Sequence, residues 1–116
     1  MKIIRCSEGL QFEKYFELTH GEDVESLNES EVESIDLNCW VLYENLGVDG
    51  EITQVLAMED CDGSQYLTVS RPFITEFMNL LGMCDDYDRK ITAIRVVHNT
   101  SKRGVGFMSC DLLGYE

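Results

Sequence analysis

Lysine and arginine are absent from a long stretch of this 116-residue chain. Between Tyr15 and Ser70 there is no Lys or Arg, while fourteen residues are Asp or Glu. Residues 8–62 hold sixteen acids against Lys14 alone, whereas the rest of the chain holds eight bases against six acids, which together give the net charge of −13. A field this negative repels the phosphates of nucleic acids and attracts basic surfaces. The acidic half therefore favours a basic protein as its partner.

Long apolar runs and paired cysteines are also absent. No segment approaches the roughly 20 apolar residues that cross a bilayer, and the first eight residues turn polar before a secretory apolar region could form. The five cysteines are odd in number, widely spaced and without a Cys-x-x-Cys pair. This pattern argues against a disulfide framework and against structural zinc. We therefore expect a cytoplasmic protein.

Motifs of known catalytic and metal sites are missing as well. The chain contains no Gly-x-Ser-x-Gly, no phosphate-cradling glycine loop and no His-Glu-x-x-His. If Gly63 is set at the invariant glycine of a calcium loop, Met58 and Val69 fall at ligand positions, so the acidic residues around Gly63 indicate a turn. We predict no enzymatic activity, no catalytic residue, no cofactor and no metal site.

The clearest helix signal follows Ser70. Ser70 can cap a helix, Pro72 stands in the first turn where its missing N–H is harmless, and apolar residues then recur at intervals of three and four. These features predict a main helix over about 71–81, with Gly82 at its end.

The apolar residues of 9–19 fit both a strand and a helix, and of the two we expect an N-terminal helix. Phe12, Tyr15 and Phe16 would share one helical face, Ser7 could cap this helix and Gly21 could end it.

Strand signals fill most of the remaining chain. β-rich runs occupy 37–43, 52–59, 65–70, 91–98 and 105–113, and residues 1–6 could add an edge strand. The Asp62-Gly63 pair between two such runs predicts a hairpin. The sequence therefore predicts a single α+β domain, 1–116, with an antiparallel β-sheet packed against the main helix. An OB-like half-barrel is the alternative arrangement.

Residues 21–36 combine high acidity with few apolar side chains. We expect an acidic loop or a weak helix there, exposed to solvent. Its carboxylates are spaced about as densely as backbone phosphates, so they would suit a groove that normally holds nucleic acid. The predicted partner-binding residues are Glu22, Asp23, Glu25, Glu29, Glu31, Glu33 and Asp36.

The opposite charge gathers near the C-terminus, where no acid occurs between positions 89 and 110. Arg95, Lys102 and Arg103 could contact phosphates, and Tyr66 and Phe107 could stack on bases. The alternative prediction is therefore a module that binds single-stranded nucleic acid through the C-terminal hairpin.

In size, acidity and α+β build, the whole chain resembles small acidic inhibitors of phages and other mobile elements, including type II anti-CRISPR proteins. That resemblance implies an inhibitor that occupies nucleic-acid-binding surfaces of an RNA-guided nuclease and blocks guide RNA or DNA loading. Two stretches, EDCDGSQYLTVSRPFITEF from residue 59 and SKRGVGFMSCDL from residue 101, also look like accessory proteins of mobile elements in low-GC Gram-positive bacteria. Some of those proteins are regarded as single-stranded-DNA-binding, which implies the alternative function.

Overall fold

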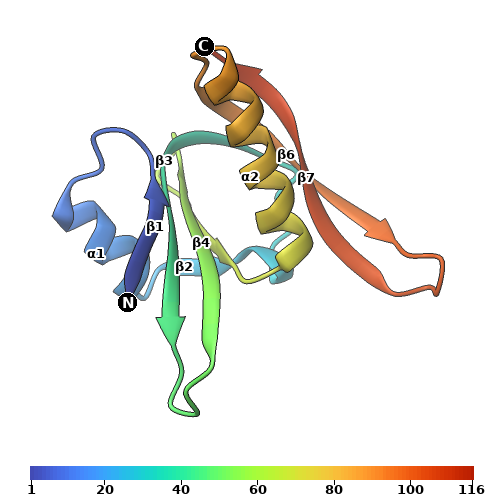
Figure 1. Cartoon of the computed structure of the whole chain (residues 1–116), viewed down its shortest axis with the longest axis horizontal. Coiled ribbons are helices and arrows are strands. Elements are labelled where there is room, and N and C mark those ends of the chain that lie inside the picture. The colour runs from blue at the N-terminus through green and yellow to red at the C-terminus, as the bar shows by residue number, and fades with distance from the viewer.

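The computed structural model describes all residues, 1–116, and confirms the α+β class (Figure 1). Its helices are α1 (Phe12–His20), α2 (Arg71–Asp86) and the 3-10 turn η1 (Leu27–Glu29). Its strands are β1 (Lys2–Cys6), β2 (Val24–Ser26), β3 (Ser34–Leu46), β4 (Ile52–Asp60), β5 (Gln65–Thr68), β6 (Ile91–Thr100) and β7 (Gly106–Tyr115). Neither α-helix has the length and apolarity that crossing a membrane requires.

One curled sheet forms the half-barrel. Its order is β2-β5-β4-β3-β6-β7, with β1 added to β3. All pairs are antiparallel, as predicted, except the parallel pair of β2 and β5. The long strand β3 pairs with β4 along one edge, while its other edge carries β6 near residues 34–36 and β1 near 41–44. Because β3 serves two neighbours on one edge, the sheet bends along it.

The central strands are buried on both faces. One face packs against α2 in the main core, which includes Trp40, Leu42 and Phe77. The other face packs against α1 in a smaller core, where Val41 and Tyr43 surround Leu18. Burial on both faces explains why residues 39–43 form an unbroken apolar run instead of alternating with polar residues.

Helix α2 is longer than the sequence predicted. Ser70 caps it through its side chain and Pro72 lies in the first turn, as expected. The helix continues through Gly82 to Asp86, so the expected end at 82 is wrong. The apolar stripe continues to Cys84, which is buried in the main core, and this packing outweighs the low helix propensity of glycine.

Helix α1 forms as predicted, but it buries a different face. Leu18 is fully buried, whereas Phe12 and Phe16 are 70% and 53% exposed. The expected apolar face of Phe12, Tyr15 and Phe16 is therefore wrong in part, because the sheet accepts the Leu18 side of the helix. Gln11 occupies the N-cap position and Gly21 the C-cap position.

Ser7 does not cap α1 but joins the β1 end to β3. Its buried hydroxyl donates to the Trp40 carbonyl at 3.2 Å and accepts from the Trp40 N–H at 3.0 Å. We expect Ser7→Ala to lower the free energy of unfolding by about 1–2 kcal/mol, because the Trp40 amide would lose its acceptor. Urea denaturation measures the change. Ser34→Ala, at an exposed serine, is the control. Equal effects of the two substitutions would show that the buried Ser7 hydroxyl contributes nothing to stability.

Candidate functional site

The acidic segment 21–36 is held in place by short ordered pieces. It contains β2, the turn η1 and the first residues of β3, so it is neither a plain loop nor an α-helix. Leu27 and Ile35 are fully buried and belong to the main core. Because these two buried side chains attach the segment to the core, its backbone is held in one conformation. The small number of apolar residues in 21–36 did not predict this.

The seven predicted acids of this segment are all exposed, and we call them the acidic rim: Glu22, Asp23, Glu25, Glu29, Glu31, Glu33 and Asp36. The three ion pairs of the protein join Arg5 to Asp85 and Lys14 to Glu17 and Glu59. None involves the acidic rim. Its charge therefore has no counter-charge in contact within the protein.

The β4–β5 turn adds more carboxylates beside the rim. The Cys61 N–H donates to the Asp36 carbonyl at 2.8 Å, and the Asp36 N–H donates to Asp60 Oδ2 at 3.1 Å. One hollow of about 510 Å³ brings carboxylates of the turn, of α1 and of the rim together. Its lining consists of Asp62, Glu17, Glu22, Asp23, Gly21, Gly63, Ser64 and Gln65. The sequence predicts only a turn for residues 60–64, because the parallel pairing of β2 with β5 that places the turn here has no local signal.

Lys14, the only Lys or Arg of residues 8–62, forms an ion pair with the buried acid Glu59. Its Nζ donates to Glu59 Oε1 at 2.7 Å and lies 3.4 Å from Glu17 Oε2. Asn38 donates to Glu59 Oε2 at 2.6 Å and Gln65 donates to Glu59 Oε1 at 3.1 Å and to Glu17. These residues form the Glu59 cluster, which fixes α1 to strands β3, β4 and β5.

The contacts within and around the Glu59 cluster change the pKa values of Glu59, Lys14 and the neighbouring Cys39. Burial alone would raise the pKa of Glu59, but the hydrogen bonds from Lys14, Asn38 and Gln65 outweigh burial and lower the pKa to about 2. The hydrogen bond to Glu59 is also the main reason that the pKa of Lys14 is raised. Burial, with the nearby Glu59 charge, raises the pKa of Cys39 to about 11. The carboxylate and the ammonium therefore both stay charged at neutral pH.

The low pKa of Glu59 predicts an acid-sensitive contribution to stability. A carboxyl whose pKa is lower in the folded state stabilises the fold above its ordinary pKa of 4.5, and this contribution is lost as the pH falls through about 2. We expect the difference in unfolding free energy between the native chain and Glu59→Gln to shrink by roughly 2–3 kcal/mol between pH 5 and pH 2. Urea denaturation of both chains across this range measures it. A constant difference would contradict the assignment.

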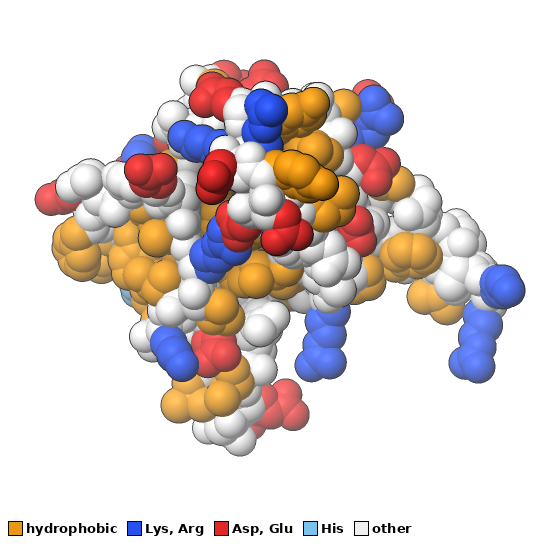
Figure 2. All heavy atoms as spheres, turned by 45° about the horizontal axis from the view of Figure 1, so that its top comes forward, with side chains coloured by type: hydrophobic (Ala, Val, Ile, Leu, Met, Phe, Trp, Pro, Cys, Tyr) orange, Lys and Arg blue, Asp and Glu red, His pale blue; other side chains and the backbone are white.

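The fold brings together only some of the residues that were predicted to bind nucleic acid. Lys102 and Arg103 are exposed at the tip of the β6–β7 hairpin, and basic side chains extend beyond its end at the right of Figure 2. Arg95 is also exposed, but it pairs in register with Ser34 of β3 on one side and with Asp111 of β7 on the other. The acid Asp111 is therefore the cross-strand neighbour of Arg95.

The two predicted stacking residues lie on different strands that do not pair. Phe107 is on β7 and is 39% exposed, whereas Tyr66 is on β5 and packs against the main core. No joint stacking platform forms from these two side chains.

Comparisons with protein-family models, with curated proteins and with solved structures found no match. The function is therefore argued from the acidic rim, the Glu59 cluster and the hairpin themselves.

Proposed function

We propose that this protein is a non-enzymatic inhibitor that binds a basic nucleic-acid-binding protein through its acidic rim. The partner would lose access to its guide RNA or DNA, because the rim occupies the surface on which phosphates normally lie. The resemblance to type II anti-CRISPR proteins makes a type II RNA-guided nuclease the first candidate partner. The protein would then act in the cytoplasm of a bacterial host.

The observation that carries this proposal is the uncompensated charge of the rim. Seven exposed carboxylates stand on one segment, and no side chain of the protein forms an ion pair with them. The one base in this half, Lys14, is held by Glu59. The carboxylates of the rim are therefore available to the basic side chains of a partner. Charge complementarity of this kind favours fast association that weakens as salt is added.

The fixed backbone of the rim also supports binding. Leu27 and Ile35 anchor the segment in the core, so a partner would not have to order a free chain before contact. Preorganisation of this kind lowers the entropic cost of association.

A competition experiment tests the proposal. The protein is mixed with a purified type II nuclease that carries no guide, and binding and target-DNA cleavage are measured before and after guide RNA is added in excess. We expect binding to the guide-free nuclease, loss of cleavage, and less inhibition when guide is added first. Absence of binding at low salt, or inhibition that is indifferent to the order of addition, would overturn the proposal for this partner.

A further inference from the structure

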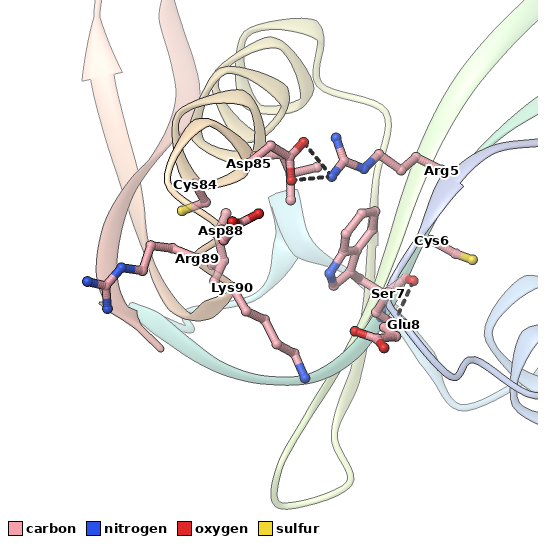
Figure 3. Close-up of a pocket in the computed structure, with 12 residues that line it drawn as sticks. Arg5, Cys6, Ser7, Glu8, Cys84, Asp85, Asp88, Arg89 and Lys90 are labelled. Atoms are coloured by element: carbon pink, nitrogen blue, oxygen red, sulfur yellow. Dashed lines mark hydrogen bonds and ion pairs between the residues drawn. The ribbon is translucent and has the colours of Figure 1, made fainter.

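A second hollow of the molecule lies at the C-terminal end of α2. It has a volume of about 410 Å³ and is lined by the end of β1, by β3, by α2 and by the loop that leads into β6 (Figure 3). Its buried apolar lining includes Trp40, Leu81 and Ile91. This hollow shares no residue with the acidic rim, and we call it the Trp40 pocket.

Trp40 offers the pocket a hydrogen-bond donor. The residue is only 6% exposed, and its ring meets Phe77 edge-on with centroids 5.1 Å apart. Its indole N–H makes no hydrogen bond within the protein, although no fully enclosed side-chain N or O atom lacks a partner. The indole N–H must therefore reach solvent, and the solvent beside Trp40 is this pocket.

Three charged residues of the lining, Arg5, Asp85 and Arg89, already have a partner within the protein. Arg5 and Asp85 pair with each other at 2.7 Å. Arg89 points away from the pocket in Figure 3, and its guanidinium lies 5.7 Å from the centre of the Tyr115 ring. These three side chains line the pocket, but each already interacts with another residue of the protein.

Apart from Arg89, three charged side chains of the lining have no ion pair: Lys90, Glu8 and Asp88. In the view of Figure 3, the Lys90 side chain extends toward Glu8. The loop that carries two of them is fixed, since the Arg89 N–H donates to the Cys84 carbonyl at 2.8 Å and the Lys90 N–H to the Glu116 carbonyl at 3.0 Å. Asp88 holds a positive φ of 53° within this loop.

We propose that the Trp40 pocket binds a free α-amino acid with an apolar side chain. The ammonium group would meet Glu8 and Asp88, while the carboxylate would meet Lys90 and the indole N–H. The side chain would then pack on the apolar lining of Trp40, Leu81 and Ile91. A simple anion would face two carboxylates and a simple cation would face Lys90, whereas a zwitterion presents a charge to the groups of each sign.

The single tryptophan of the chain makes the test direct. L-phenylalanine is titrated into the protein while the fluorescence of Trp40 is followed, because phenylalanine does not emit under selective excitation of tryptophan. Two analogues are titrated in parallel: N-acetyl-L-phenylalanine, which lacks the ammonium, and L-phenylalaninamide, which lacks the carboxylate. We expect a saturable change with a dissociation constant of about 1 mM or tighter for L-phenylalanine, and binding at least about tenfold weaker for both analogues.

Two substitutions test which side chains of the pocket contact the carboxylate and the ammonium of the amino acid. Lys90→Met should abolish the preference for L-phenylalanine over the amide, and Glu8→Gln should reduce its preference over the N-acetyl compound. Lys102→Met removes the same charge from an exposed site outside the pocket and should leave all three titrations unchanged. A response that does not saturate, equal responses to the three compounds, or equal effects of Lys90→Met and Lys102→Met would overturn the proposal. None of these outcomes depends on the proposed inhibitor function, because no partner protein is present.

Discussion

Replacing Lys14 with methionine should lower the free energy of unfolding by about 2–3 kcal/mol. The substitution keeps the apolar stem of the side chain but leaves the buried Glu59 carboxylate, whose side chain is 7% exposed, without its cation. Breaking a fully buried pair costs about 3–5 kcal/mol, and the 34% exposure of the Lys14 side chain reduces that figure. Urea denaturation at neutral pH measures the effect, with an unchanged slope as evidence that only stability has changed.

Two further variants separate the ion pair from loss of charge in general. Lys2→Met removes the same charge from an exposed residue without an ion pair, and we expect it to change stability by less than about 0.5 kcal/mol. The double variant Lys14→Met with Glu59→Gln should be more stable than Lys14→Met alone, because the uncompensated charge is gone. If Lys14→Met behaved like Lys2→Met, the Glu59 cluster would contribute nothing to stability.

Local signals in the sequence identified most of the secondary structure. The cap at Ser70, the proline after it and the apolar period located α2, and Asp62-Gly63 located the hairpin between β4 and β5, where Gly63 has a φ of +91°. The end of α2 was misplaced because Gly82 is a helix breaker only where packing does not continue beyond it. Here Cys84 extends the packed face by one turn.

Features that depend on pairing between distant residues could not be predicted. Glu59 lies 45 positions from Lys14, and neither residue alone suggests that it is buried or paired. The burial of β3 on both faces was likewise hidden, since an unbroken apolar run fits a strand with one or two covered faces. The acids of the rim were predicted as exposed and are exposed, because charge without a nearby base favours solvent.

Reversing charge at four residues of the acidic rim should weaken binding to the proposed partner by about 100-fold or more at low salt. The variant carries Glu25→Lys, Glu29→Lys, Glu31→Lys and Glu33→Lys. These side chains are exposed and make no hydrogen bond or ion pair within the protein, so the fold should not be harmed. A complementary field accelerates association by about 10–10³-fold, and a reversed one repels the same basic surface.

The measurement is the affinity for the guide-free type II nuclease across a series of salt concentrations. A control variant changes the net charge equally through four exposed acids outside the rim: Glu13→Lys, Glu51→Lys, Asp86→Lys and Glu116→Lys. We expect the rim variant to lose affinity and most of its salt dependence. The control should keep the larger part of both at about 0.1 M ionic strength, where screening limits the reach of exposed charges to about 10 Å. Equal losses in both variants would show that net charge alone drives association and would remove the rim as a specific surface. Full binding by the rim variant would exclude the electrostatic mechanism altogether.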